Sequence, residues 1–175
     1  ANIQKDQSVL IIGASGAIGS AAVQLAVHHF GAEVTGVCST QGIEYVKSLG
    51  AARVIDYKNE DFTKNGESYD LIIDVLGKGS FSKYRASLSQ KGIYMPVSFK
   101  TAKLFQMFRT SVGGGKRVIC ALATPSQQDL VFIREFLEDR KLKPVIDQIF
   151  PLEKAAEAHM HVEAGNKKGS VVLTV

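Results

Sequence analysis

The sequence predicts an α/β fold of the Rossmann type, a doubly wound parallel sheet in a single three-layer domain over residues 1–175. Short, almost wholly apolar segments alternate with segments whose apolar residues recur at helical spacing. The apolar segments show no inside–outside alternation, as expected of strands buried on both faces of a parallel sheet. Glycines fall where elements should end, at Gly31, Gly50, Gly77 and Gly92. Together these observations indicate helices on both faces of one sheet.

Six strands and three helices are expected in the main part of the chain. The strands are predicted at residues 8–12, 33–38, 52–56, 69–75, 92–97 and 116–123. The helices are predicted at residues 17–30, 43–50 and 81–88. Two interpretations stay open for residues 101–117, which either form a substrate-side lid with a glycine hinge or cover the sheet edge with Leu104, Phe105 and Phe108. Further strands at 145–150 and 170–175 flank a helix at 153–163.

Three glycines spaced three apart follow the first strand. Gly13 permits a sharp turn, Gly16 lets a pyrophosphate approach the backbone, and Gly19 lets the helix pack close to the strand. The N–H groups at the start of the helix would point at the anion. The glycine pattern alone is weak, since a turn without a ligand can show it too. Its position between a buried strand and a helix favours a dinucleotide site.

The end of the second strand indicates which dinucleotide is preferred. An NAD site usually has Asp or Glu there, which binds the ribose 2′-hydroxyl. Here Cys38, Ser39 and Thr40 occupy that region, and Glu33 lies at the other end of the strand. A 2′-phosphate would meet hydroxyl groups and no carboxylate from this strand. The pattern therefore favours NADP(H) over NAD(H).

Composition argues against several other classes of protein. No apolar run approaches the roughly 20 residues that cross a bilayer, so no membrane partner is expected. The net charge of +4 comes from basic and acidic residues that are mixed along the chain, which gives no indication of a nucleic-acid surface. The distant Cys38 and Cys120 suggest reduced thiols and a cytoplasmic location. His159 and His161, two residues apart on one helix, do not suggest a zinc site.

Several stretches resemble a known family, among them "GASGAIG", "YDLIIDVLG", "KGIYMPVSF" and the C-terminal segment from residue 136 to 175. They are similar to the cofactor domain of the medium-chain dehydrogenase/reductase superfamily, in its zinc-independent quinone oxidoreductase (zeta-crystallin-like) branch. The resemblance implies hydride transfer from NADP(H) to a quinone or enone. It implies no zinc, and it assigns no catalytic residue to this chain.

The resemblance also implies cofactor-binding positions. Ser15, Gly16, Ala17 and Ile18 match the turn that holds the pyrophosphate. Cys38, Ser39 and Tyr57 match positions beside the adenosine ribose and its phosphate. Leu76 and Gly77 match the segment lining the adenine and ribose side, and Val97 and Ser98 match the segment near the nicotinamide half. Several relatives have an arginine at the position of Gln41 or a lysine at that of Gly42, so the contacts to the 2′-phosphate differ in this chain.

Relatives of this kind carry an N-terminal catalytic domain before the cofactor domain, and the tail at residues 145–175 would normally contact it. The resemblance thus predicts that this chain is a cofactor domain that is inactive in isolation. It also predicts a homodimer that pairs through the sixth strand, at 116–123. That apolar run would be a hazard as a bare edge, which agrees with pairing.

Two other functions are alternatives for a chain with this glycine-rich turn. A short-chain dehydrogenase or epimerase would need a Tyr-x-x-x-Lys pair, and none of the five tyrosines has a lysine four residues on. A non-catalytic NADP(H)-binding or redox-sensing module stays open as the alternative. Asp74, at the end of an apolar strand, is expected to orient a loop or cap a turn rather than to act in catalysis.

Overall fold

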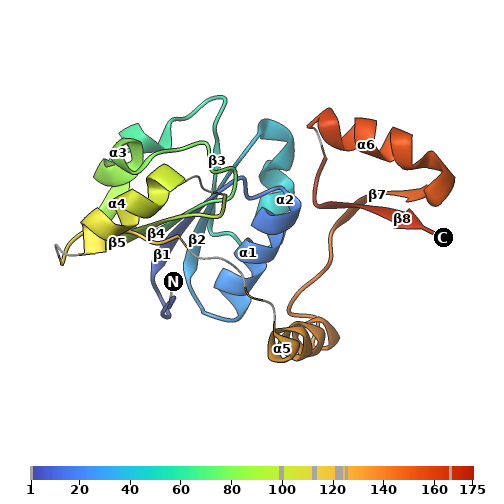
Figure 1. The fold of residues 1–175 in the computed structure, drawn as a ribbon, viewed down its shortest axis with the longest axis horizontal. Coiled ribbons are helices and arrows are strands. Elements are labelled where there is room, and N and C mark those ends of the chain that lie inside the picture. Colours follow the sequence, from blue (N-terminus) through green and yellow to red (C-terminus); the bar gives the residue numbers. More distant parts are fainter. Residues whose placement is uncertain (1, 99–100, 112–113, 121–123, 125, 166) are drawn as a thin grey trace.

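The computed structural model describes residues 2–98, 101–111, 114–120, 124, 126–165 and 167–175. Six parallel strands form the main sheet in the order β3-β2-β1-β4-β5-β6 (Figure 1). The strands are β1 (Ser8–Ile12), β2 (Glu33–Cys38), β3 (Arg53–Asp56), β4 (Tyr69–Asp74), β5 (Leu88–Pro96) and β6 (Arg117–Val118). The order proceeds outward in opposite directions from β1 and β4, which confirms the predicted doubly wound sheet.

Helices cover both faces of this sheet. α1 (Ala17–His28) and α2 (Ile43–Ser48) lie on one face, while α3 (Phe81–Tyr84) and α4 (Thr101–Ser111) lie on the other (Figure 1). Alternate residues of β1 enter two separate cores: Val9 and Ile11 pack on the α1 side, whereas Leu10 and Ile12 pack with Tyr84 on the α3 side. Because each strand faces two cores, it reads as an unbroken apolar run.

Several elements end earlier than predicted. α1 ends two residues short of residue 30 and α2 two residues short of residue 50, each just before a glycine with positive φ (Gly31, 65°; Gly50, 101°). The helix predicted at 81–88 is a single turn followed by a 3₁₀ turn over Arg85–Ser87. β5 then begins at Leu88, four residues before the predicted start.

The sixth strand is shorter than the predicted 116–123. Of the described residues in this segment, Arg117 and Val118 pair in register with β5, and the Ile119 N–H adds one further bond to the Tyr94 carbonyl at 3.0 Å. The next ladder bond would need an N–H from residue 96 of β5, which is a proline and has none. Residues 121–123 lie outside the described residues.

The segment at 101–117 begins with a helix that packs on β6. Met107 of α4 packs into the core on the α3 side, and the Thr110 hydroxyl accepts a hydrogen bond from the Val118 N–H at 3.0 Å. Phe105 and Phe108 are exposed, so they do not cover the sheet edge as one interpretation expected. The side chain of Leu104 lies outside the described part of the chain.

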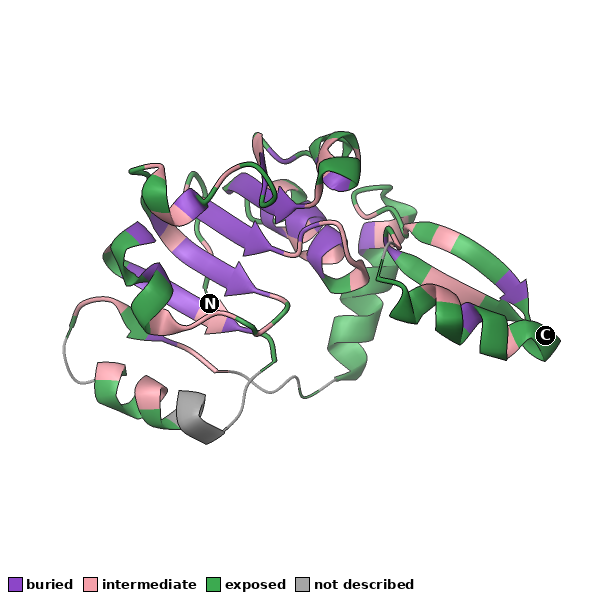
Figure 2. Cartoon of the chain, turned by 90° about the horizontal axis from the view of Figure 1, so that it is seen from above, coloured by how far each residue is buried: buried purple, intermediate pink, exposed green. Residues whose placement is uncertain are grey.

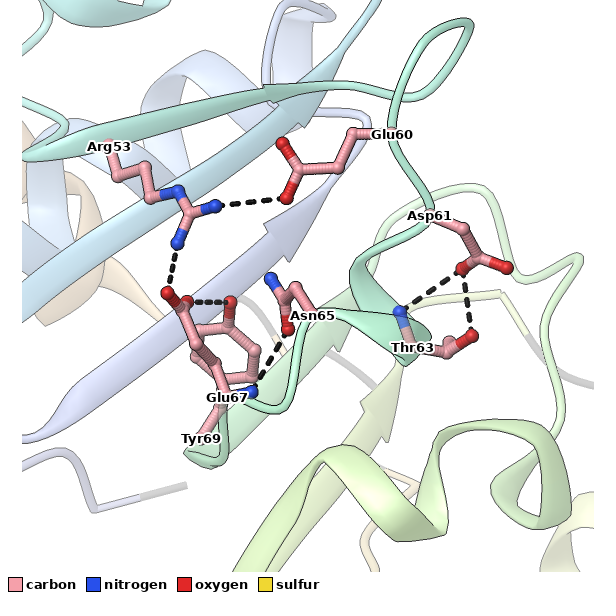
Figure 3. Close-up of polar contacts among 7 residues, drawn as sticks. All are labelled: Arg53, Glu60, Asp61, Thr63, Asn65, Glu67 and Tyr69. Carbon is pink, nitrogen blue, oxygen red and sulfur yellow. Dashed lines mark hydrogen bonds and ion pairs between the residues drawn. The ribbon is translucent and has the colours of Figure 1, made fainter.

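A polar network fixes the connection between β3 and β4. Arg53 pairs with Glu60 at 2.9 Å and with Glu67, and Glu67 accepts a hydrogen bond from the Tyr69 hydroxyl at 2.8 Å (Figure 3). These bonds link the first residue of β3 to the first residue of β4. The crossover between two strands that are not neighbours is thereby held against the sheet.

The C-terminal part adds elements outside the three layers. β7 (Ile146–Pro151) and β8 (Ser170–Thr174) form a separate parallel pair beside α6 (Ala155–Glu163). α5 (Gln127–Glu138) precedes them and was not predicted, although a capping box formed by Ser126 and Asp129 marks its N-terminus. Figure 2 shows mostly buried strands in the main sheet, and α5 and α6 largely exposed. The single three-layer domain thus describes the main sheet but not the tail.

Candidate functional site

The turn between β1 and α1 lies where the strand order reverses, which in such sheets is the place of the ligand crevice. Gly13 has φ +85°, and the N–H groups of Gly13 and Ala14 both donate to the Val37 carbonyl, at 2.9 and 3.1 Å. A Cβ on Gly19 would lie 2.0 Å from the Gly13 carbonyl oxygen. Gly13 therefore makes the turn, and Gly19 permits the close packing of α1 on it.

Gly16 differs from the other two glycines because the protein itself leaves space beside it. Among the described residues, a Cβ on Gly16 would meet just the Gly13 carbonyl oxygen, at an ordinary 3.5 Å. Gly16 is the N-cap of α1, and no side chain caps the helix. The side of Gly16 on which a Cβ would stand is therefore open, while its backbone lies beside Gly169 of the tail. This cradle fits the pyrophosphate of a dinucleotide, which backbone N–H groups and the helix dipole would hold.

Cys38 ends β2 directly beside this turn. It is 2% exposed, and burial together with the charge of Asp56 raises the pKa of its thiol to about 11. The thiol is thus protonated at neutral pH and packs rather than reacts. A Cβ on Gly42 would lie 2.9 Å from the Ser15 Cβ and 3.1 Å from the Cys38 Sγ. The absence of a lysine at position 42 has a steric reason, since no side chain fits there without movement.

A carboxylate lies next to the end of β2, although β2 itself supplies none. Asp56 of β3 is the register partner of Cys38 and is 8% exposed. Its Oδ2 accepts hydrogen bonds from the Thr40 hydroxyl at 2.5 Å and the Asn59 side-chain amide at 2.8 Å, and its Oδ1 accepts from the Lys58 N–H at 3.0 Å. The expectation that a 2′-phosphate would meet hydroxyl donors and no carboxylate therefore needs correction. The parallel pairing of β2 and β3, which brings their carboxyl ends together, was the missed signal.

Ser39 and Tyr57 extend the same end of the sheet. The Tyr57 N–H donates to the Cys38 carbonyl at 3.1 Å, which ties the chain after β3 to the end of β2. The Tyr57 side chain is 60% exposed. Its ring is therefore accessible to solvent at the carboxyl end of the sheet, as the adenosine-side position would require.

Asp74 shapes the loop that follows β4. It is 1% exposed, its Oδ1 accepts from the Gly77 N–H at 2.9 Å, and its Oδ2 accepts from the Gly79 N–H at 2.9 Å. The Tyr94 hydroxyl also donates to Oδ2, at 2.9 Å, and burial followed by the charge of Asp74 raises the pKa of Tyr94 strongly. These bonds confirm the expectation that Asp74 orients a loop.

The loops after β4 and β5 meet at the crevice. Gly77 has φ +64°, and a Cβ there would lie 2.3 Å from the Ser98 carbonyl oxygen. The Val97 N–H donates to the Asp74 carbonyl at 3.0 Å. Leu76 lies against the turn, its Cγ 3.3 Å from the Cβ position of Gly13. The structure thus brings Leu76, Gly77, Val97 and Ser98 together beside the glycine turn.

The tail contacts the same turn. The Gly169 N–H donates to the Ser15 carbonyl at 3.1 Å, and Gly16 and Gly169 form an isolated parallel bridge. A second anchor joins Gln24 of α1 to the backbone of Lys143, with bonds of 2.8 and 3.2 Å. Within this chain the tail therefore docks on α1 and its preceding turn.

All the predicted cofactor residues lie at the carboxyl ends of the strands. They follow β1, β2, β3, β4 and β5 in turn: Ser15, Gly16, Ala17, Ile18, Cys38, Ser39, Tyr57, Leu76, Gly77, Val97 and Ser98. Ser15 and Cys38 meet around Gly42, and Gly77 meets Ser98. Sequence reasoning missed Asp56. Within the described ranges, no three His, Cys, Asp or Glu side chains are grouped to hold a metal ion, and no helix is long and apolar enough to span a membrane.

Residues 49–173 match the zinc-binding dehydrogenase family. The chain is 30% identical to a chloroplast envelope quinone oxidoreductase homolog of Arabidopsis thaliana, over 97% of this chain and 53% of the relative. It is 32% identical to the human mitochondrial NAD(P)H oxidoreductase RTN4IP1, over 95% of this chain and 48% of the relative. The solved quinone oxidoreductase of Coxiella burnetii superposes with a TM-score of 0.88 at 27% identity, covering 100% of this chain and 55% of that one. The chain spans about half the length of these relatives.

Proposed function

The chain belongs to the zinc-binding dehydrogenase family, and from this membership we propose that it is the NADP(H)-binding part of an oxidoreductase that reduces a quinone or an enone. The observation that carries the proposal is the space beside Gly16 at the uncapped N-terminus of α1. The relatives named as quinone oxidoreductase homolog and NAD(P)H oxidoreductase support the class of reaction.

Each part of the site has a role in this proposal. When bound, the nicotinamide cofactor supplies the hydride, and this chain supplies binding and orientation. The turn at Ser15–Ile18 holds the pyrophosphate through backbone N–H groups, and Ser39 and Tyr57 lie beside the adenosine ribose. The loops at Leu76–Gly77 and Val97–Ser98, fixed by Asp74, border the remaining cofactor. We assign no catalytic residue within the chain.

The family name includes zinc, but the residues described here do not fit that metal. No cluster of three His, Cys, Asp or Glu side chains occurs in the described ranges, and a zinc site needs three or four such ligands. We therefore propose that this part of the protein acts without zinc of its own. Its share of the reaction is cofactor binding, so no step is assigned to a metal.

Calorimetric titration of the chain with NADPH and with NADH tests the proposal. We expect saturable binding of about one nucleotide per chain, with NADPH the tighter ligand because Ser39 supplies a hydroxyl donor and Tyr57 an exposed ring at the positions assigned to the ribose phosphate. A chain that binds neither NADPH nor NADH would contradict the proposed function. Tighter binding of NADH than of NADPH would contradict the preference for NADP(H) but not the proposed function.

The cellular location and the assembly also belong to the proposal. The cytoplasmic location suggested by the wide separation of Cys38 and Cys120 in the sequence stays a prediction, since the relatives named above include chloroplast and mitochondrial proteins. A homodimer through β6 likewise stays a prediction. Its outward N–H groups at Val118 and Cys120 already donate to the side chains of Thr110 and Met107 of α4, so pairing there requires α4 to move.

A further inference from the structure

The hydroxyl of Thr40 is committed to a buried carboxylate. A threonine hydroxyl has a single hydrogen to donate and two lone pairs that accept. That hydrogen is directed at Asp56 Oδ2, 2.5 Å away. Thr40 is an exposed residue two positions beyond β2, and its hydroxyl oxygen keeps its acceptor lone pairs. This acceptor oxygen suits a donor such as a ribose hydroxyl better than it suits a phosphate, which at neutral pH is largely ionised and mainly accepts hydrogen bonds.

The carboxylate behind Thr40 carries its negative charge at neutral pH. Hydrogen bonds from the Thr40 hydroxyl and the Lys58 N–H lower the pKa of Asp56. Among the residues that the structure describes, no ion pair neutralises it at close range, and the bonded groups from β2 and the following turn are neutral donors. Lys58 is the cation that adds a longer-range attraction. A phosphate on the ribose would therefore meet an unpaired negative charge close to the end of β2.

We propose that Asp56, acting through Thr40, is a positioning residue that limits the preference of this site for a 2′-phosphate over a 2′-hydroxyl. The proposal rests on the proposed function and deepens it. Ser39 and Tyr57 favour the phosphate, while the Asp56–Thr40 pair favours the hydroxyl. The discrimination between NADPH and NADH is then the difference between two opposed contributions, set by residues on two neighbouring strands.

The variant Asp56→Asn tests this directly because it keeps the shape and removes the charge. Its Oδ1 still accepts from the Lys58 N–H, while its amide nitrogen donates to the Thr40 oxygen and so reverses that bond. The same nitrogen meets the Asn59 amide, which must turn over so that its oxygen accepts. The Thr40 hydrogen is then free to donate to a phosphate. We expect the ratio of NADH to NADPH dissociation constants to rise by about tenfold, as expected for removing one unit charge near a phosphate.

The variant Thr40→Val removes the acceptor and keeps the charge. We expect NADH to bind several-fold more weakly and NADPH to change little, because the lost hydroxyl had no hydrogen to offer the phosphate. Titration with 5′-ADP and 2′,5′-ADP should reproduce both results, since these probes carry just the adenosine half. Asp61→Asn is the matched control: Asp61 also accepts from a threonine hydroxyl and a backbone N–H, but at the start of the 3₁₀ turn Phe62–Lys64.

Thermal unfolding establishes that each variant is folded before titration. A folded Asp56→Asn variant with the wild-type affinity ratio would overturn the inference while leaving the proposed function intact. If that variant does not fold, Thr40→Val decides: equal weakening of NADH and NADPH would overturn the inference. Failure of the wild type to bind any of the four nucleotides would instead contradict the proposed function.

Discussion

At the scale of single residues, buried carboxylates organise the crevice. Asp74 ends β4 and Asp56 ends β3, and the carboxylate of each accepts three hydrogen bonds from described donors. Asp74 accepts from two glycine N–H groups and a tyrosine hydroxyl, so it fixes loop backbone. Asp56 accepts hydrogen bonds from side chains as well as from the backbone, and it fixes the direction in which the Thr40 hydroxyl donates its hydrogen. The two carboxylates therefore have different roles although both end apolar strands.

Asp74→Asn should loosen the loop after β4. Asp74 Oδ2 accepts from both Gly79 and Tyr94, and an amide nitrogen at that position would face two donors. We expect a loss of about 2 to 3 kcal/mol in the free energy of unfolding, the usual cost of leaving buried polar groups unpaired, together with weaker NADPH binding. Urea denaturation measures the first and calorimetry the second. Tyr94→Phe is the milder control, and an Asp74→Asn variant as stable as the wild type would refute this role.

The residues of the glycine turn were predictable from sequence, and Asp56 was not. The turn is local: Gly13, Gly16 and Gly19 lie within seven residues between a strand and a helix, and their spacing follows from the chain path itself. Asp56 reaches Thr40 through the pairing of β2 with β3, eighteen positions from Cys38 along the chain but its register partner. Sequence reasoning that examined the end of a single strand could not include its neighbour.

At the scale of elements, the sequence predicted the six strands of the main sheet but not all of their limits. Apolar runs mark β1 to β5 because each is buried on both faces. β6 is short because Pro96 on β5 lacks the next N–H, a constraint imposed by a partner strand. α5 was missed although Ser126 and Asp129 form a capping box, since its apolar residues Leu130 and Ile133 are exposed rather than packed in a clear core.

The tail elements should depend on pH through Asp147. Asp147 of β7 accepts from His161 of α6 at 2.6 Å and from the Lys168 N–H at 2.9 Å, and these bonds, that from His161 foremost, lower its pKa. A carboxylate whose pKa is lowered in the folded state contributes its full stabilisation of that state above its unfolded pKa of about 3.9. This stabilisation is lost as the pH falls through the pKa of the folded state.

We therefore expect Asp147→Asn to be less stable than the wild type at pH 6, with the difference vanishing towards pH 2. Thermal unfolding of both proteins across this range measures it. Asp139→Asn, in an exposed pair with Lys141, is the control that should change little. A stability difference that persists undiminished in acid would refute the assignment.

At the scale of the whole molecule, the edge of the main sheet decides whether two copies can pair. A bare strand edge invites pairing with another chain. Here α4 covers the edge at β6. The Thr110 hydroxyl accepts a hydrogen bond from the Val118 N–H, and Met107 Sδ accepts one from the Cys120 N–H. A symmetric dimer of two such edges would need these N–H groups released.

Sedimentation equilibrium of the wild type and of Thr110→Val tests the predicted dimer. Removing the threonine hydroxyl takes away one of the two described hydrogen bonds that tie the β6 edge to α4. A dimer that forms when α4 moves off this edge should therefore tighten by several-fold, in line with one hydrogen bond fewer to break. Ser111→Ala, at the exposed end of α4, is the neighbouring control. A wild type that stays monomeric, with no response to Thr110→Val, would show that β6 makes no dimer.

We propose that the turn at Gly16 receives the pyrophosphate of a nicotinamide dinucleotide. Gly16→Ala and Gly19→Ala form a matched pair on the same helix. The added Cβ meets nothing closer than 3.5 Å at Gly16 but lies 2.0 Å from the Gly13 carbonyl oxygen at Gly19. Gly19→Ala should therefore lose about 1 to 3 kcal/mol of stability, as overpacked sites do.

The decisive measurement is the NADPH affinity of Gly16→Ala by calorimetry, alongside its melting temperature. We expect a variant that melts within a few degrees of the wild type and binds NADPH at least about tenfold more weakly, because the methyl group occupies the space that the pyrophosphate needs. Wild-type affinity in a folded Gly16→Ala variant would contradict the claim that this turn is the dinucleotide site.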